Sequence, residues 1–169
     1  MSTPKIVFEI ENFGTINAEL YPEKAPATVE NFLSLLRRGF FDGLIFHRVI
    51  EGFMIQGGGY DTDMNDRDAE TIKGEFASNG FPQNDLKHTR GTLSMARTNI
   101  PDSASSQFFI MHQNAPHLDG AYAAFGRVTD DESLAVVDKI AAVPTGRYVY
   151  FADVPREPVV ITRAYVVEE

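Results

Sequence analysis

Residues 46–58 read FHRVIEGFMIQGG, a pattern of two short apolar strands with a break at Glu51-Gly52. The segment brings Arg48, Met54 and Gln56 close together in the sequence. A second segment, SQFFIM at residues 106–111, has the pattern of a partner strand. Together they supply a permanent cation, side-chain amides and large apolar groups, but no obvious nucleophile. This set favours a site that grips an uncharged peptide and rotates a bond without breaking one.

Outward from this stretch, the pattern predicts a mainly β chain. Residues 5–10 and 14–21 alternate on either side of a turn at Asn12-Phe13-Gly14, which predicts a hairpin. Further strands are expected at residues 45–49, 53–56, 91–96, 107–111, 124–128 and 159–167. Many short strands with hairpin-type links and only two helices predict a closed antiparallel barrel, with the helices plugging its open ends.

Two segments have helical spacing. The first opens at residues 25–28 and can end at Gly39, with Pro26 tolerated in its first turn. Its buried stripe is expected at Val29, Phe32, Leu33, Leu36 and Phe40. The second helix is expected at residues 130–143, with one face formed by Leu134, Val137, Ile140 and Ala141. Residues 57–90, 97–105 and 144–158 are predicted to be mostly loop.

Composition and charge limit the possible functions. The 169 residues contain no internal repeat or linker, so residues 1–169 are expected to form one domain, and a monomer. The formal net charge of -9 would repel a phosphate backbone, which argues against nucleic acid as a partner. The chain has no Cys, no signal-peptide pattern at its start and no apolar run long enough to span a bilayer. We therefore expect a cytoplasmic protein that does not bind membranes.

Several common catalytic patterns are missing. The four His, at positions 47, 88, 112 and 117, show no metal-ligand spacing, and no G-x-S-x-G motif surrounds any Ser. Gly57-Gly58-Gly59 lacks the Lys-Ser/Thr of a phosphate-binding loop, and a turn that needs positive φ explains these glycines better. A triad of Ser94, His117 and Asp119 could be written down, but no local signature supports it. We expect neither a metal nor another cofactor.

Residues 46–58 strongly resemble the signature of the cyclophilins, which are peptidyl-prolyl cis–trans isomerases. Similar motifs follow in the family's order: GTLSMA at residues 91–96, S-x-x-S-Q-F-F-I at 103–110, and LDG at 118–120 with FGRV at 125–128. The similarity spans residues 5–167 and is weakest at 60–89. The segments at residues 145–147 and 153–155 make the chain more similar to bacterial cytosolic members. The resemblance implies an eight-stranded antiparallel barrel capped by two helices, acting on proline-containing peptides and on unfolded or native proteins.

The same resemblance implies roles for ten residues. Arg48 matches the catalytic arginine, and Gln56 and Gln107 match groups that hold the substrate backbone. The main-chain clamp beside the proline corresponds to Ala96 and Arg97. The wall and rim of the proline pocket correspond to Phe53, Met54, Phe109, Leu118 and Tyr122. Strand alternation independently puts Gln107 and Phe109 on one face and Phe108 on the other, in the core.

Three positions depart from well-known animal members. His117 stands where those members carry a Trp that matters for cyclosporin, so cyclosporin is expected to bind weakly. Tyr122 replaces a His at the pocket rim, and its phenol can still donate a hydrogen bond. Arg97 replaces the usual Asn, which matters little if the clamp is main chain. The loop at residues 97–105 is slightly longer, which can alter the preference for residues that precede the proline.

Other interpretations of the same residues remain open at this point. Arg48 could be a structural ion-pair residue, and Phe53, Met54 and Phe109 could simply be core. Strand alternation turns His47 away from Arg48, so we interpret it as a structural residue with its hydrogen bonds satisfied. The chain could also be a module that binds proline segments without significant turnover. A barrel that binds a small ligand, or a metal-dependent enzyme, is opposed by the lack of close His ligands.

Overall fold

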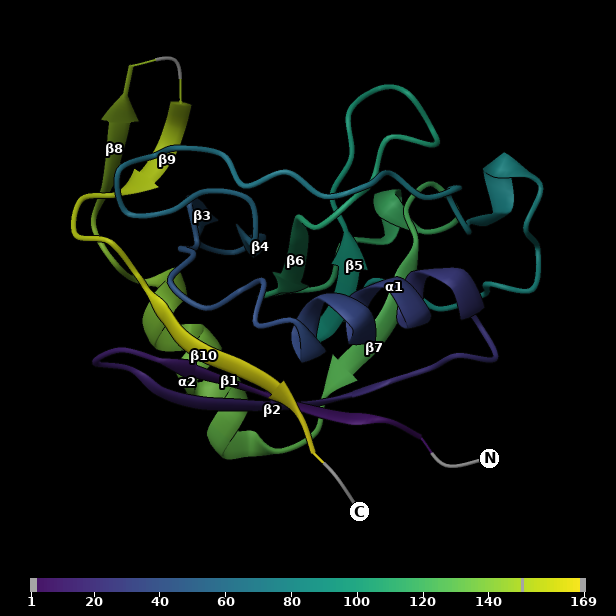
Figure 1. The fold of residues 1–169 in the computed structure, drawn as a ribbon, viewed down its shortest axis with the longest axis horizontal. Helices are drawn as coiled ribbons and strands as arrows, with labels where there is room; N and C mark the ends of the chain where they lie inside the picture. The colour runs from purple at the N-terminus through teal and green to yellow at the C-terminus, as the bar shows by residue number, and fades with distance from the viewer. Residues whose placement is uncertain (1–2, 150, 168–169) are drawn as a thin grey trace.

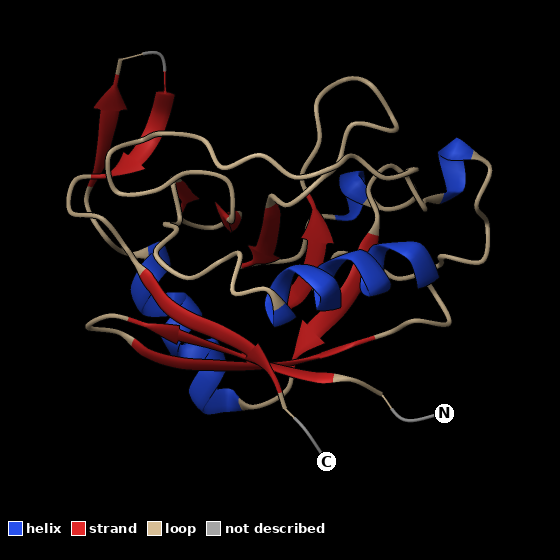
Figure 2. Cartoon of the chain, viewed as in Figure 1, coloured by secondary structure: helices blue, strands red, loops and turns tan. Residues whose placement is uncertain are grey.

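The computed structural model describes residues 3–149 and 151–167 of the chain. Its ten strands are β1 (Lys5–Ile10), β2 (Gly14–Leu20), β3 (Arg48–Ile50), β4 (Met54–Gly57), β5 (Thr92–Met95), β6 (Phe108–Met111), β7 (Ala124–Val128), β8 (Thr145–Tyr148), β9 (Phe151–Pro155) and β10 (Ile161–Val166). Its helices are α1 (Pro26–Arg37), α2 (Asp131–Ala141) and the short 3₁₀ turns η1 (Ala77–Asn79) and η2 (Pro116–Leu118). Most of residues 57–90 is loop, as expected (Figure 2).

Eight strands form one antiparallel sheet in the order β10-β1-β2-β7-β5-β6-β4-β3 (Figure 1). The two ends of this sheet meet near a single bridge between Ile45 and Val160. There the Phe46 N–H donates to Val159 O over 3.0 Å and the Ile161 N–H donates to Leu44 O over 2.8 Å. The mainly β, eight-stranded, two-helix architecture is thus confirmed. The barrel closes at a short seam between its ends and not by a continuous strand ladder.

Helix α1 is anchored by a carboxylate from a distant loop. Ala25, at its N-cap, has no side-chain oxygen to accept from the first helical N–H groups. Glu75 takes that role: its Oε1 accepts from the Thr28 N–H and the Thr28 hydroxyl, both over 2.7 Å, and its Oε2 accepts from the Ala27 N–H over 3.2 Å. A negative group at this end also complements the helix dipole. The loop around Glu75 is therefore tied to the helix.

The buried face of α1 differs from the predicted stripe at two positions. Val29, Phe32 and Leu36 are buried as predicted, whereas Leu33 and Phe40 are only half-buried. Leu35 takes the interior position instead, because the helix meets the core on the face shared by Thr28, Phe32 and Leu35. The Phe32 ring is central, since its centroid lies 4.9–6.3 Å from those of Phe8, Phe41, Phe108 and Phe125.

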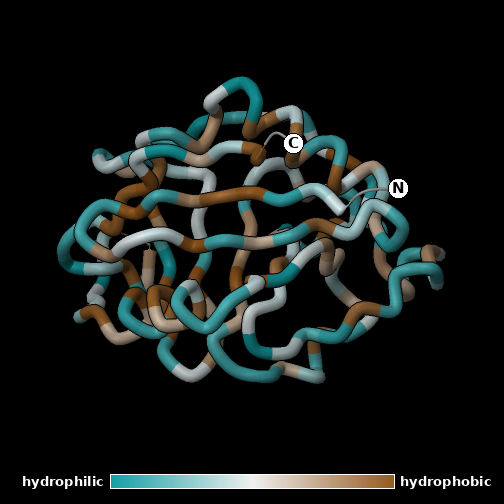
Figure 3. Tube along the Cα trace, turned by 90° about the horizontal axis from the view of Figure 1, so that it is seen from below, coloured by the Kyte–Doolittle hydropathy of each residue, from teal (hydrophilic) through white to brown (hydrophobic). Residues whose placement is uncertain are grey.

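Helix α2 has its own cap. The Asp130 Oδ1 accepts from the Ser133 N–H over 2.7 Å, and this bond is the main reason that the pKa of Asp130 is lowered. Val137, Ile140 and Ala141 are buried as predicted, but Leu134 is half-exposed and Ser133 and Val136 occupy the interior with them. None of the helices in the described residues is long and apolar enough to cross a membrane. Figure 3 shows hydrophobic stretches of the chain interrupted by hydrophilic ones.

The prediction of loop over residues 144–158 is wrong. Strand β8 pairs with β9 in a two-stranded hairpin that projects from the sheet (Figure 1). Proline and glycine at Pro144, Gly146, Pro155 and Pro158 mask the short alternation on which a strand prediction depends. The hairpin packs back on the body of the protein through Phe151, whose ring centroid lies 5.1 Å from that of Tyr60 and 6.4 Å from that of His47.

His47 is buried beneath this hairpin. It does not line the cavity that contains Arg48, and its ring packs on Tyr60 with the centroids 4.6 Å apart. The expectation of satisfied hydrogen bonds is wrong for one atom, because the buried Nδ1 has no partner among the described residues. Burial, with a smaller contribution from the charge of Arg48, lowers the pKa of His47 from 6.5 to about 4.

This burial predicts a loss of stability in mild acid. Above pH 6.5 the imidazole is neutral in both states, but between pH 6.5 and about 4 the unfolded chain takes up a proton that the folded chain excludes. The free energy of unfolding should therefore fall by up to roughly 3 kcal/mol over this window. Urea titrations of the wild type and of His47→Phe from pH 8 to 4 measure this effect. Parallel pH curves for the two proteins would contradict it.

Candidate active site

Strands β4 and β6 carry buried apolar residues on both of their faces. Phe108 and Ile110 belong to the main core, together with Ile55 and Leu93. The alternate residues form a separate group on the other face, which we call the pocket cluster. Its buried members are Met54, Phe109, Met111, Ala115 and Leu118, with Ile50, Phe53, Ala96 and Tyr122 packed at its edge. The division follows the two-residue period of a strand, and it confirms the opposite orientations predicted for Phe108 and Phe109.

The pocket cluster surrounds a cavity of about 130 Å³. Nine of the ten predicted site residues line it: Arg48, Phe53, Met54, Gln56, Ala96, Arg97, Phe109, Leu118 and Tyr122. The tenth, Gln107, lines an adjoining cavity of about 150 Å³ that shares Gln56, Ala96 and Arg97 with the first. Thr98, Ser103 and Ser105 complete this second cavity. No sequence pattern indicates these hydroxyls, because they lie in a loop without a periodic pattern.

Strand register places Arg48 in this site. Arg48 is paired with Gln56 across β3 and β4, and Gln56 is paired with Phe109 across β4 and β6. The Arg48 Nη1 donates to Gln56 Oε1 over 3.1 Å, and Gln56 Nε2 donates to Gln107 Oε1 over 3.0 Å. Within residues 3–149 and 151–167, no carboxylate lies at ion-pair distance from Arg48. The ion-pair interpretation of Arg48 therefore does not hold, and its charge faces the cavity without a counterion.

The three glycines after Gln56 let the strands approach closely. The positive φ that was expected for these glycines is found at Gly58, at 88°, but not at Gly57 or Gly59. Gly57 and Gly59 are needed for space: a Cβ would lie 2.6 Å from Ile45 O at Gly57, and 2.5 Å from the Gln107 side chain at Gly59. Side chains at these positions would displace the β3–β4 pair or the amide of Gln107. The glycines therefore serve the packing of this site and not a phosphate.

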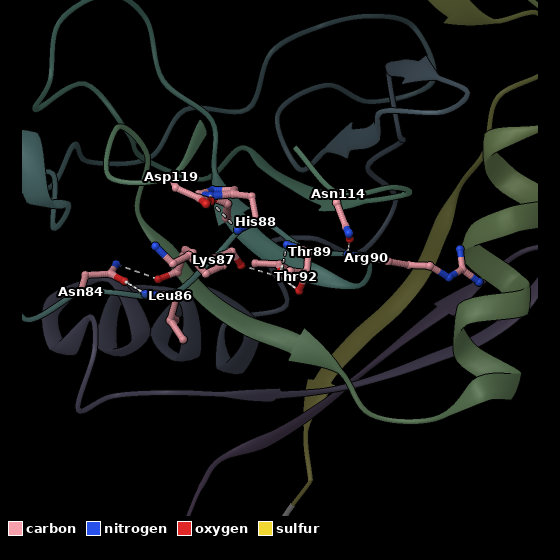
Figure 4. Close-up of polar contacts among 11 residues, drawn as sticks. Asn84, Leu86, Lys87, His88, Thr89, Arg90, Thr92, Asn114 and Asp119 are labelled. Atoms are coloured by element: carbon pink, nitrogen blue, oxygen red, sulfur yellow. Dashed lines mark hydrogen bonds and ion pairs between the residues drawn. The ribbon is translucent and has the colours of Figure 1, made fainter. Parts of the chain in front are cut away.

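A clamp from α2 holds the turn that carries Phe53. The His112 side chain accepts at Nδ1 from the Gly52 N–H over 2.8 Å. The backbone N–H of His112 donates to Phe53 O over 2.9 Å. Its Nε2 lies 3.1 Å from Asp138 of α2, and Arg90 makes two bonds to the same carboxylate, at 2.6 and 3.0 Å. Figure 4 shows Arg90 reaching towards the helix. Hydrogen bonding by Arg90 is the main cause that lowers the pKa of Asp138, and His112 contributes less. No sequence pattern indicates this clamp, because Gly52, Arg90, His112 and Asp138 lie far apart in the chain.

A buried Ser-His-Asp chain lies behind Phe109, with His88 and not His117 at its centre. The His88 Nδ1 lies 3.1 Å from Asp119 Oδ1 (Figure 4). The His88 Nε2 lies 2.9 Å from Ser94 Oγ. Burial lowers the pKa of His88, against the opposing effect of Asp119. Ser94 is 0% exposed, and the His88 ring is stacked on Phe109. Because a substrate cannot reach its serine, this chain supports the pocket wall and is not a nucleophilic triad.

We predict that Ser94→Ala destabilises the fold without removing a nucleophile. The change leaves the buried Nε2 of His88 without its partner, which should cost about 1–3 kcal/mol in the free energy of unfolding. Urea denaturation measures the loss, with Ser34→Ala at an exposed position of α1 as the matched control. Covalent labelling of the wild type at Ser94 by a fluorophosphonate would contradict this structural role.

Similarity to known proteins identifies the family. Residues 5–166 match the family model described as "Cyclophilin type peptidyl-prolyl cis-trans isomerase/CLD". The chain belongs to the cyclophilins. This cyclophilin is 51% identical over 156 residues to a peptidyl-prolyl cis-trans isomerase of Acinetobacter baylyi, covering 89% of this chain and 79% of the relative. It is 46% identical over 166 residues to peptidyl-prolyl cis-trans isomerase B of Escherichia coli, covering 93% and 96% of the two chains.

Solved structures agree with this assignment. The crystal structure of a cyclophilin-type isomerase from Cryptosporidium parvum superimposes with a TM-score of 0.83 at 27% identity, covering 99% of both chains. A second structure of that protein, solved in the presence of the dipeptide Ala-Pro, gives a TM-score of 0.77 at 28% identity, covering 98% of this chain and 99% of that one. The cyclophilin described here is thus a peptidyl-prolyl cis–trans isomerase, an enzyme that catalyses rotation about X-Pro bonds and so assists protein folding.

No group of three or more His, Cys, Asp or Glu within the described ranges could hold a metal ion. The isomerase reaction requires neither a cofactor nor a proton transfer, since no bond is made or broken.

Proposed function

We propose that this cyclophilin isomerises X-Pro bonds in the cavity of the pocket cluster, with Arg48 as the catalytic residue. The observation that supports this role is the uncompensated charge of Arg48 at the mouth of an apolar cavity. A structural arginine normally has an anionic partner, whereas one that acts on a substrate must keep donors free. Arg48 uses Nη1 towards Gln56, which leaves other guanidinium donors for a ligand.

The electronic structure of the amide explains why a guanidinium helps. Rotation must break amide resonance, at a cost of about 18–20 kcal/mol. In the planar amide, electron density is shifted from nitrogen to oxygen, but in the twisted transition state the nitrogen becomes pyramidal and regains its lone pair. A guanidinium that donates to this nitrogen binds the twisted form better than the planar one, which is the differential binding that catalysis requires. Arg suits the task because it stays charged and its donors are fixed in a plane.

The remaining residues of the cavity would hold the substrate. We assign the proline ring to the apolar walls formed by Phe53, Met54, Phe109 and Leu118. These walls exclude the water that would otherwise stabilise the planar dipole. Gln56 and Gln107 would bind the backbone on one side of the bond, so that the other side can rotate. The Ala96 N–H already donates to Gln107 O over 2.9 Å, so a main-chain clamp must use the other backbone groups of Ala96 and Arg97.

Removing the guanidinium should slow the reaction at least tenfold. A charge-assisted hydrogen bond contributes roughly 1.5–3 kcal/mol, which corresponds to one to two decades in rate. We expect Arg48→Ala to lower kcat/KM for an Ala-Pro peptide accordingly while the protein stays folded, because Arg48 is exposed and makes one side-chain bond. Arg127→Ala, at an exposed strand position outside the pocket, is the matched control. A loss of less than threefold in kcat/KM in a folded Arg48→Ala protein would contradict the catalytic role assigned to Arg48.

The same measurement addresses the alternative of a binding module. A module that only grips proline segments would show a saturable shift of peptide NMR signals but no turnover in the wild type. Arg48, which has no ion-pair partner in the part of the chain that the structure describes, favours an enzyme, since binding alone does not require it. We further propose that the protein acts as a monomer in the cytosol on unfolded and native clients; the cell compartment, the oligomeric state and the exclusion of nucleic acid and membranes remain predictions.

Weak binding of cyclosporin is expected because of His117. This residue is exposed and its ring is stacked on Phe53, with the centroids 5.9 Å apart, so it stands beside the pocket. A Trp at this position would add apolar area and an indole N–H donor. We expect His117→Trp to lower the Kd of cyclosporin at least tenfold, as measured by calorimetric titration. Tight binding by the wild type that does not change in His117→Trp would show that the departure is irrelevant.

A further inference from the structure

The side chain of Arg97 is packed between two aromatic rings beside the pocket. Its guanidinium carbon lies 4.7 Å from the ring centroid of Phe76 and 4.6 Å from that of Tyr122. Nη2 donates to Ala121 O over 2.6 Å, and Nη1 donates to Thr98 O over 2.9 Å. Four contacts thus hold the Arg97 side chain. The sequence had led us to expect a role for the main chain of Arg97 only.

These contacts join the rim of the pocket to the main core. Phe76 is buried, belongs to the main core and does not line the cavity. Phe76 directly follows Glu75 in the chain, and the hydrogen bonds of Glu75 to α1 therefore hold the backbone next to Phe76 in place. Tyr122 and Leu118 lie on the other side and line the cavity. The Arg97 guanidinium is therefore the bridge between a fixed ring and a ring at the substrate site.

The arrangement is not an ion pair. Within the described ranges no carboxylate lies at ion-pair distance from Arg97, and its Nε is buried without a hydrogen-bond partner. A buried donor without a partner is costly, so the two cation–π contacts and the bond to Ala121 must offset that cost. A lysine could supply charge and a donor, but not a plane that two rings can sandwich.

We propose that Arg97 is a positioning residue for substrate binding in this cyclophilin. Its guanidinium holds the Tyr122 ring in place across the cavity from Ala96. Through its bond to Ala121 O, it also holds the rim segment that carries Leu118. The inference rests on the proposed use of this cavity as the substrate site. It concerns the affinity for the substrate and not the rotation step, because Arg97 has no contact with Arg48 or Gln56 among its hydrogen bonds.

The main test separates KM from kcat. We expect Arg97→Ala to raise KM for an Ala-Pro peptide at least fivefold, with kcat changed less than twofold. Arg97→Lys should behave like Arg97→Ala, since it keeps the charge and loses the plane. Arg163→Ala is the matched control: it removes another arginine stacked on an aromatic ring, 4.2 Å from the Tyr165 centroid, on β10 outside the pocket. This control should leave both constants unchanged.

A second test uses Phe76, which cannot touch a substrate in the cavity. Phe76→Leu keeps an apolar side chain in the core but removes one face of the sandwich, so it should raise KM in the same direction. Added to Arg97→Ala, it should cause little further increase, because the two changes interrupt the same chain of contacts. Aromatic NMR signals of Tyr122 should shift in Arg97→Ala and Arg97→Lys, and stay in place in Arg163→Ala.

Three outcomes would overturn the proposal: an unchanged KM in folded Arg97→Ala, full restoration by Arg97→Lys, or additive effects of Arg97→Ala and Phe76→Leu. Restoration by lysine would mean that charge and not stacking matters.

Failure of this proposal can be distinguished from failure of the proposed site. If Arg48→Ala has a low kcat/KM while Arg97→Ala binds the peptide normally, the cavity is the active site but Arg97 does not position its rim. If neither changes, the assignment of the cavity itself is wrong.

Discussion

Strand β6 is buried on both of its faces, and the site depends on this constraint. Phe108 and Ile110 pack into the main core, while Phe109 and Met111 pack into the pocket cluster. A strand with one solvated face could not carry an apolar cavity on its outer side. The cavity wall is therefore as rigid as the sheet, since the wall and the core are alternate residues of the same backbone. Loops and turns supply the rest of the cavity, and each of them is tied to the sheet or to a helix.

The two arginines of the site illustrate two uses of one side chain. Arg48 is exposed, has no counterion in the described residues and makes one hydrogen bond to an amide. Arg97 is held by two rings and two carbonyls. A group that must interact more strongly with a twisted bond needs free donors, whereas a group that fixes a wall needs all of its faces occupied. The same guanidinium thus suits the proposed catalytic role when it is left open, and packing when it is enclosed.

The parts of this fold that are local in sequence could be predicted, and the parts that join distant segments could not. Alternation placed Phe108 and Phe109 on opposite faces, and helical periodicity located α2 to within two residues. By contrast, the cap of α1 comes from Glu75, 47 positions beyond Thr28, and the Phe53 turn is held by His112, 60 positions beyond Gly52. Chain order contains no sign of such pairings. Arg97 was interpreted through its backbone alone, because nothing in the sequence brings Phe76 and Tyr122 to its two faces.

The hairpin of β8 and β9 has a consequence for how molecules meet one another. Strand β3, which carries Arg48, is the last strand of the sheet and has a ladder partner on one side only. An open strand edge is a template on which a second chain can add, and short edges that are covered avoid this. Here β3 has three residues and β9 lies beside it, with Phe151 packed over the neighbouring His47. The hairpin therefore keeps the edge next to the proposed catalytic site from being extended by another protein, while the cavity that Arg48 lines is left uncovered.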